Sequence, residues 1–367
     1  MILFLDLKKV NSIYETAFQE KLNAFLGKGY YILGDEVKLF EENFAAYCDS
    51  KNCIGVGNGY DALTLIFKGY IQLGKMQKGD EVIVPANTYI ASILSIIQAD
   101  LVPVLVEPKL ETYTINPDLI QDKITSKTKA ILAVHLYGQL AEIDKINAIA
   151  LQNNLIVVED AAQSHGAFLG KNRKSTNTQA FSFYPGKNLG ALGDGGAIIT
   201  NDEELAKVLF SLRNYGSEVK YLNNYIGINS RLDELQAAFL NVKLPNLDVD
   251  NEHRRTIAKR YLSGIKNDKI TLPFWDFSDN HVFHLFVIRT ENRKELQDYL
   301  KENGIETMIH YPVPPHKQKA FSPETSGWND LSFPITEKIH NEVLSLPISP
   351  IMTVDEVDFV VEILNTY

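Results

Sequence analysis

Short apolar runs alternate with helix-patterned segments through the first half of the chain, and this alternation limits the possible folds most strongly. Each run is rich in apolar and β-branched residues and has the length of a buried strand. Seven runs have this character, at residues 53–56, 81–85, 102–106, 130–135, 155–158, 180–183 and 196–200. Because helices between most successive strands serve as crossover connections, the pattern predicts an α/β fold with a mostly parallel seven-stranded sheet sandwiched by helices.

The other segments predict a helical arm before the sheet and a second, smaller domain after it. Apolar residues recur at helical spacing at 11–47 with a break at 30–34, 61–73, 89–98, 117–123, 143–153, in a long run from Asp233 past Arg254, and at 294–303. A strand-like run at 283–289 lies near the end. We therefore expect a large domain at 1–250, which includes the arm, and a small C-terminal α/β domain at 251–367.

Charge and composition exclude several classes of partner. The net charge is −10 and the pI about 5.4, so no overall positive field attracts nucleic acid or anionic lipid. The N-terminal segment reaches Asp6 after four apolar residues, and the apolar window 89–106 is interrupted by polar residues, so no signal peptide or membrane span is expected. Cys48 and Cys53 are too few ligands for a metal site and indicate free thiols in a cytoplasmic protein.

An acidic strand end and a downstream lysine carry the strongest chemical signal. Asp160 lies in 159–166 (Glu-Asp-Ala-Ala-Gln-Ser-His-Gly), and Lys187 follows the aromatic run 181–184 and precedes a glycine-rich segment. A pyridoxal phosphate site needs a lysine that forms a Schiff base with the cofactor aldehyde and a carboxylate that keeps the pyridine nitrogen protonated. Lys187 and Asp160 are the predicted pair. The alternatives are a helix cap for Asp160 and a solvated loop position for Lys187.

Groups that suit a phosphate and a planar ring occur at three further places. Ser182 precedes Lys187 by five residues, and Gly59 and Tyr60 offer backbone N–H groups at the predicted start of a helix. Tyr89 is an aromatic that can stack on a pyridine face. Each signal is weak alone, because glycine turns also close hairpins and tyrosines also fill ordinary cores.

Together these motifs make the chain resemble the nucleotide-sugar aminotransferases, which are fold type I pyridoxal phosphate enzymes that aminate keto sugars. The likeness covers nearly the whole length and is closest to the sugar 3-aminotransferases. It is carried in order by 4–8 (Phe-Leu-Asp-Leu-Lys), 31–34 (Tyr-Ile-Leu-Gly), 57–59 (Gly-Asn-Gly), 85–89 (Pro-Ala-Asn-Thr-Tyr), 159–166, 181–196 and 227–234 (Gly-Ile-Asn-Ser-Arg-Leu-Asp-Glu).

The resemblance implies a role for each matching residue. Lys187 would bind the cofactor aldehyde, Asp160 would pair with the ring nitrogen, and Gln163 would lie near the phenolic oxygen. The remaining cofactor contacts would be stacking by Tyr89 and phosphate binding by Ser182, Gly59, Tyr60 and the partner subunit's Asn229. The last contact implies a homodimer. Dehydratase relatives carry histidine in place of the lysine, so a lysine at this position favours transamination.

The same resemblance suggests a reaction and a substrate. L-Glutamate would be the amino donor, and the acceptor a nucleotide-linked keto-deoxyhexose. The segment 135–139 (His-Leu-Tyr-Gly-Gln) is similar to that of relatives acting at C3 of dTDP-linked sugars, which favours a dTDP-3-keto-6-deoxyhexose. The alternatives are a C4 aminotransferase acting on a related 4-keto sugar, and a pyridoxal phosphate-binding dehydratase or sensor. The destination suggested by the family is a surface polysaccharide.

Three cationic and three aromatic side chains are predicted to contact the substrate. Arg254 and Lys8 are candidates for its diphosphate, as is Arg255 beside Arg254, because an acidic protein needs local cations there. Tyr184, His310 and Tyr311 are candidates for the sugar. The competing explanations are solvated helix charges for the cations and ordinary packing for the rings.

Overall fold

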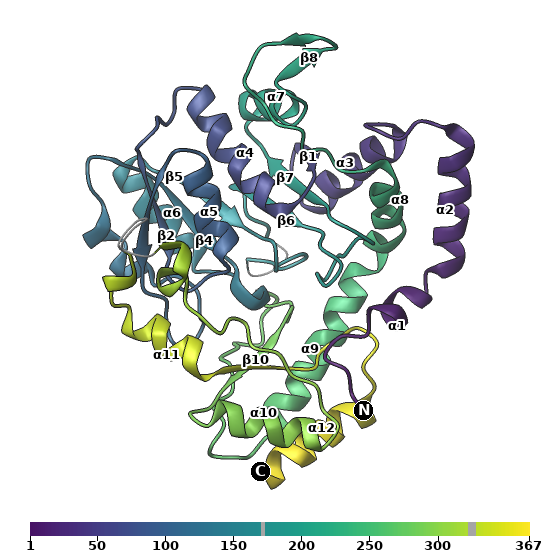
Figure 1. Ribbon diagram of the computed structural model, residues 1–367, viewed down its shortest axis with the longest axis vertical. Helices are drawn as coiled ribbons and strands as arrows, with labels where there is room; N and C mark the ends of the chain where they lie inside the picture. Colours follow the sequence, from purple (N-terminus) through teal and green to yellow (C-terminus); the bar gives the residue numbers. More distant parts are fainter. Residues whose placement is uncertain (170–172, 322–327) are drawn as a thin grey trace.

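The structure, a computed structural model, describes residues 1–169, 173–321 and 328–367. Its centre is a seven-stranded sheet, so the predicted strand count is confirmed (Figure 1). The strands are β1 (Asn52–Val56), β2 (Glu81–Pro85), β3 (Val102–Val106), β4 (Thr128–Val134), β5 (Ile156–Asp160), β6 (Thr178–Ser182) and β7 (Gly196–Thr200).

The strand order β1-β7-β6-β5-β4-β2-β3 decides where functional side chains gather. Strand β7 runs antiparallel to both of its neighbours, and the pairs β2–β3, β2–β4, β4–β5 and β5–β6 are parallel. Since β1 and β6 both oppose β7, they run in the same direction as the rest. The carboxyl ends of six strands therefore lie along one edge, where ligand sites of open α/β sheets form.

Helices cover both faces of this sheet, as predicted. Alternate residues of a strand face opposite sides. Val82 and Val84 belong to an apolar cluster with α4 (Gly59–Gln72), α5 (Ile90–Gln98) and α7 (Glu203–Leu212). Ile83 packs with α6 (Ile143–Asn153) on the other face. The buried strands and their two helical layers form the core.

The N-terminal arm consists of α1 (Leu7–Ser12), α2 (Glu15–Lys28) and α3 (Asp35–Tyr47), with the predicted break before α3. Glu234 of α8 (Glu234–Lys243) holds this break in place: its carboxylate accepts from the backbone N–H groups of Gly34 at 2.9 Å and Glu36 at 2.7 Å. A Cβ at position 34 would lie 2.5 Å from that carboxylate, so the close approach requires glycine. A negative side chain thus stabilises the positive end of α3.

A second sheet lies beyond the long helix α9 (Leu247–Gly264), in the lower part of Figure 1. Strands β10 (Phe286–Arg289) and β11 (Val343–Leu346) pair antiparallel there. They share an apolar cluster with α9, α10 (Arg293–Glu302) and α12 (Val354–Thr366), whereas α11 (Pro334–Glu342) packs toward the large sheet. The domain boundary predicted at residue 250 falls inside α9 and stays a prediction.

Two local expectations were wrong, and one element was missed. Residues 117–123 form two short 3-10 turns, Pro117–Leu119 and Gln121–Lys123, in place of one helix. The run from Asp233 divides at a 3-10 turn that contains Pro245, which separates α8 from α9. The hairpin of β8 (Ser217–Val219) and β9 (Leu222–Asn223) was not predicted. Within the described ranges no helix has the length and apolar character of a membrane span, and both cysteines are buried and free.

Candidate active site

A cavity of about 820 Å³ opens where the carboxyl ends of the strands meet. Its lining comes from the segments that follow β1, β2, β4, β5 and β6, from the N-terminal segment, and from the C-terminal part, which contributes residues 306–311 together with Arg254, His284, Leu285 and Ile348. The structure brings together here most of the predicted site residues, namely Gly59, Tyr60, Tyr89, Asp160, Gln163, Ser182, Tyr184, Lys187, Arg254, His310 and Tyr311. Lys8 and Asn229 do not line it.

Lys187 faces this cavity from the loop that follows β6. Its backbone N–H donates to the carbonyl of Tyr184 at 2.8 Å, which fixes the loop. Burial lowers the pKa of its amine to about 8, and the nearby Asp160 carboxylate opposes that shift. A lowered pKa leaves more of the amine uncharged and nucleophilic near neutral pH.

Asp160 is the last residue of β5 and is buried. One carboxylate oxygen, Oδ1, accepts from the backbone N–H of Ala162 at 3.1 Å, and Oδ2 accepts from the hydroxyl of Ser92 at 2.7 Å. Both oxygens are acceptors, which is the pattern of an ionised carboxylate. Each oxygen keeps a further lone pair for a donor in the cavity, such as a protonated ring nitrogen.

The start of α4 forms a cradle beside Ser182. Asn58 caps the helix, since its side chain accepts from the N–H of Asp61 at 2.8 Å, and the N–H groups of the first turn lack intrahelical partners. A Cβ at Gly59 would lie only 2.7 Å from the Cβ of Ser182. The absence of a side chain at 59 therefore lets the helix N-terminus and the serine approach one shared space, which suits a phosphate group.

Aromatic and amide groups form the opposite wall. The Gln163 side chain accepts from the N–H of Tyr137 at 2.6 Å and donates to the hydroxyl of Tyr311 at 3.1 Å. The ring of Tyr311 lies 5.2 Å, centroid to centroid, from that of Tyr89, which lines the cavity and is 52% exposed. Tyr137 also donates to the carbonyl of His310. This wall ties the large sheet to the C-terminal part.

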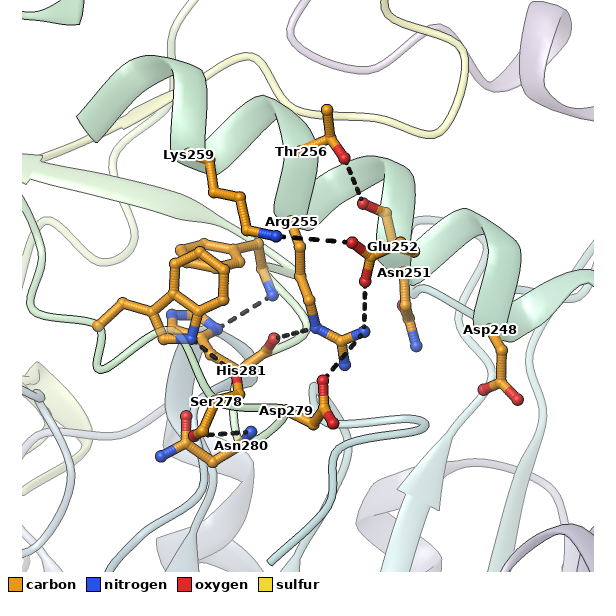
Figure 2. Close-up of polar contacts among 12 residues, drawn as sticks. Asp248, Asn251, Glu252, Arg255, Thr256, Lys259, Ser278, Asp279, Asn280 and His281 are labelled. Atoms are coloured by element: carbon orange, nitrogen blue, oxygen red, sulfur yellow. Dashed lines mark hydrogen bonds and ion pairs between the residues drawn. The ribbon is translucent and has the colours of Figure 1, made fainter. Parts of the chain in front are cut away.

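The arginines proposed for a diphosphate are occupied by contacts within the chain. Arg254 is buried, and its Nη1 donates to the carbonyls of Phe283 at 3.3 Å and Ile348 at 3.0 Å. Figure 2 shows Arg255 of α9 between Glu252 and Asp279, with its Nε donating to the carbonyl of His281 at 3.1 Å. Arg255 is not among the described residues that line the cavity.

Lys8 and Asn229, which also lie outside the cavity, are both exposed. Lys8 lies on α1, although its neighbour Leu7 lines the cavity, and Asn229 pairs with Asn214 in an isolated bridge. The sequence-based prediction assigned Asn229 to a partner subunit's site, which a single chain does not contain. The roles of both residues stay predictions.

Sequence reasoning missed several residues that complete the site. Thr88 and Ser92 hydrogen-bond to each other at 2.8 Å beside Asp160, and His284 lines the cavity with its Nδ1 3.2 Å from Asn188 Oδ1. Burial, together with the charge of Lys187, holds the pKa of His284 well below its usual range and lowers that of His310 to about 4. Both rings are neutral near pH 7, so they add no charge beside Lys187.

Gly59→Ala is expected to weaken binding of pyridoxal phosphate by about tenfold or more, because the added methyl group forces the helix start away from Ser182. The measurement is a fluorescence titration of the cofactor-free protein. Gly27→Ala in α2 is the control, since its Cβ meets no atom within 4 Å and its affinity should be unchanged. Equal affinities for wild type and Gly59→Ala would contradict the cradle.

The lowered pKa of Lys187 predicts how the cofactor-free protein captures an aldehyde. The rate should rise about tenfold per pH unit below pH 8 and level off above about pH 8, because only the neutral amine attacks and its pKa is about 8. Borohydride trapping at a series of pH values measures this rate. A simple lysine derivative treated in parallel should keep accelerating to about pH 10. A protein profile that follows the simple amine would refute the shift.

Comparison with known proteins agrees with this geometry. The chain is 56% identical to dTDP-3-amino-3,6-dideoxy-alpha-D-galactopyranose transaminase of Aneurinibacillus thermoaerophilus, with 100% of this chain and 99% of that protein covered. The structure of the present chain matches that of S. venezuelae DesV in complex with a ketimine intermediate, with a TM-score of 0.95 and 43% identity. The match covers 100% of this chain and 98% of DesV. The present chain also matches NtdA from Bacillus subtilis with bound cofactor PMP, with TM-score 0.90, 34% identity and coverage of 99% and 84%.

The family match extends over almost the entire chain. The DegT/DnrJ/EryC1/StrS aminotransferase family is matched by residues 12–365, which include the whole seven-stranded sheet and all the cavity-lining residues except those of the N-terminal segment. Structural relatives with more than 30% identity contain the same fold over the full length. On both grounds the chain belongs to the DegT/DnrJ/EryC1/StrS family of sugar aminotransferases.

Proposed function

We propose that this aminotransferase moves the amino group of L-glutamate to C3 of a dTDP-linked 3-keto-6-deoxyhexose and produces the 3-amino sugar and 2-oxoglutarate. One observation carries the proposal: Lys187 and Asp160 face the same large cavity among groups suited to a phosphate and a ring. The choice of carbon and nucleotide is supported by the 56% identity to a dTDP-3-amino-sugar transaminase.

The residues present fit pyridoxal phosphate. Gly59, Tyr60 and Ser182 would hold its phosphate, Tyr89 would cover one ring face, and Asp160 would face its ring nitrogen. When bound, the cofactor supplies an aldehyde that accepts the amine and a protonated ring that stabilises negative charge at the reacting carbon. Gln163, fixed by Tyr137 and Tyr311, would donate its N–H toward the phenolic oxygen.

Lys187 performs the proton transfers. With the cofactor bound, its Nζ would accept the proton from the α-carbon of glutamate and later give a proton back, so the same amine would serve as base and as acid. With the keto sugar the direction reverses, and Nζ delivers a proton to the sugar carbon that receives nitrogen. The pKa of about 8 suits both tasks, because an amine that titrates near the working pH both accepts and donates protons readily.

The sugar would lie against Tyr184, His310 and Tyr311, which face the cavity from two parts of the chain. Among the described lining residues the cationic side chains are Lys187 and Arg254, and Arg254 is bound to backbone carbonyls. The diphosphate would therefore extend toward the outside, near Lys8 and a second chain. We propose that the protein is a homodimer, and the exposed apolar side chains of the break at 30–32 and of the β8–β9 hairpin support this. We also propose that it acts in the cytoplasm.

The test is incubation of the purified protein with glutamate and each of two sugars, a dTDP-3-keto-6-deoxyhexose and a dTDP-4-keto-6-deoxyhexose. Mass spectrometry should detect replacement of the keto oxygen by an amine and an equal amount of 2-oxoglutarate, and NMR should place nitrogen at C3. Amination at C4 instead would replace the proposal with the 4-aminotransferase alternative. Loss of sugar oxygen without gain of nitrogen would indicate a dehydratase, and no reaction with either sugar would reject the substrate class.

A further inference from the structure

Two buried hydroxyl groups, one on helix α5 and one just before it, form a chain of hydrogen bonds that ends at the carboxylate of Asp160. Ser92 lies in the first turn of α5 and is fully buried, as is Thr88 just before the helix. The Ser92 hydroxyl is 2.7 Å from Asp160 Oδ2 and 2.8 Å from the hydroxyl of Thr88. Asp160 and Ser92 are 68 positions apart in the chain, so only the fold joins them.

The direction of each hydrogen bond follows from the protons available. An ionised carboxylate only accepts, so the single hydroxyl proton of Ser92 points to Asp160. Thr88 must then donate to Ser92, because the Ser92 oxygen has no second proton. The chain of donors runs from Thr88 through Ser92 to Asp160, and a hydroxyl that itself accepts a hydrogen bond is a stronger donor.

These contacts fix the carboxylate of Asp160 through both of its oxygens. The backbone N–H of Ala162 holds Oδ1, and Ser92 holds Oδ2, so rotation about the Asp160 side chain would break one of two bonds in a buried place. Breaking a buried hydrogen bond to a charged group is costly. Asp160 lines the same cavity as Lys187, so the carboxylate is held where a donor bound in that cavity can reach it.

We propose that Ser92, assisted by Thr88, is a positioning residue that holds the Asp160 carboxylate against the ring nitrogen of the bound cofactor. This inference rests on the proposed role of Asp160, and it adds a group that the sequence motifs did not single out. Ser92 does not line the cavity, so it acts through Asp160 and not by touching cofactor or substrate.

The decisive experiment compares the affinity of two cofactors for the cofactor-free full-length protein. One is pyridoxal phosphate, and the other is its 1-deaza analogue, in which carbon replaces the ring nitrogen. In Ser92→Ala the affinity for pyridoxal phosphate should fall about tenfold, the effect of losing one hydrogen bond to a charged group, and the affinity for the analogue should stay within about twofold. For the cofactor-loaded variant, kcat should fall while KM for glutamate stays constant.

Ser95→Ala is the matched control. Ser95 lies on the same helix, is equally buried, and donates to the Ser92 carbonyl at 2.8 Å without contacting Asp160. It should change neither affinity. Ser92→Cys keeps the size of the side chain and replaces the hydroxyl with a weaker donor, so an intermediate loss is expected even if Ser92→Ala folds poorly.

Three results would overturn parts of this scheme, and they differ from one another. An equal loss of both cofactors in the Ser92 variants would make Ser92 a general structural residue. If Ser92→Ala leaves the affinity for both cofactors unchanged, Ser92 has no positioning role. A wild-type protein that binds the two cofactors equally well would reject the role of Asp160 itself, whatever the Ser92 variants do, whereas the identity of the sugar would be unaffected.

Discussion

Lys187→Ala is expected to lower turnover of glutamate and keto sugar by about a thousandfold or more, the effect of removing a nucleophile that is also the proton carrier. The side chain faces the cavity, and burial lowers its pKa to about 8. The measurement is 2-oxoglutarate release, together with the visible spectrum before and after glutamate. Wild type should lose the band of its lysine-bound cofactor, and the variant should never form that band.

Two further variants separate the amine from its charge and from the lysine content of the protein. Lys187→Arg keeps a positive charge but offers no amine that can form a Schiff base, so it should be as inactive as the alanine variant. Lys123→Ala, at an exposed position, should behave as wild type. Substantial turnover in either Lys187 variant would reject the assignment of this lysine.

Asp160→Asn is expected to reduce kcat by about a hundredfold or more, because the amide keeps the shape of the side chain but provides no negative charge for the ring nitrogen. In the variant, the amide oxygen can keep the contact of Oδ1 with Ala162, and the amide NH2 then takes the place of Oδ2. Because that group donates and does not accept, the hydrogen bond from Ser92 is lost. Turnover and the rate of the spectral change with glutamate measure the effect.

Asp194→Asn tests whether any carboxylate at the cavity has this importance. Asp194 also lines the cavity, but it is exposed, so its charge is screened by water. Its variant should retain kcat within about twofold, the size of effect typical of a screened surface charge. Equal losses of kcat in the two variants would mean that the total negative charge of the cavity matters, and not a specific contact of Asp160. An unchanged kcat in Asp160→Asn would reject the proposed contact between Asp160 and the ring nitrogen.

The sequence predicted the sheet and the placement of its strands well because both depend on local patterns. Buried strands need continuous apolar runs, and the crossover rule then limits how such runs connect. The prediction of one helix at residues 117–123 was wrong because seven positions are too few for a stable isolated helix. Pro117 suits the first position of a 3-10 turn equally well. The hairpin of β8 and β9 is too short and exposed for an alternating pattern to mark it.

The candidate site was partly predictable for a related reason. Asp160, Ser182 and Gly59 follow strands whose carboxyl ends share one edge, so a fold prediction already brings them together. Ser92 was missed because nothing in its neighbourhood of Ile and Ala marks a buried hydroxyl as a partner of a carboxylate. Charge alone suggested Arg255 as a ligand for a diphosphate, and that role stays a prediction; in the structure its guanidinium contacts the carbonyl of His281 and the carboxylate of Asp279.

Two parts of the chain line the cavity, namely the segments around the large sheet and the C-terminal part. The phosphate cradle, the lysine and the aspartate come from segments around the large sheet, whereas residues 306–311 reach in from the C-terminal part. Since His310 and Tyr311 are proposed to contact the sugar, we expect changes in that short segment to alter which sugar is accepted without altering Lys187 or Asp160. We therefore expect that exchanging residues 306–310 between relatives changes the sugar that is aminated. Such an exchange leaves Tyr311 and its hydrogen bond with Gln163 in place.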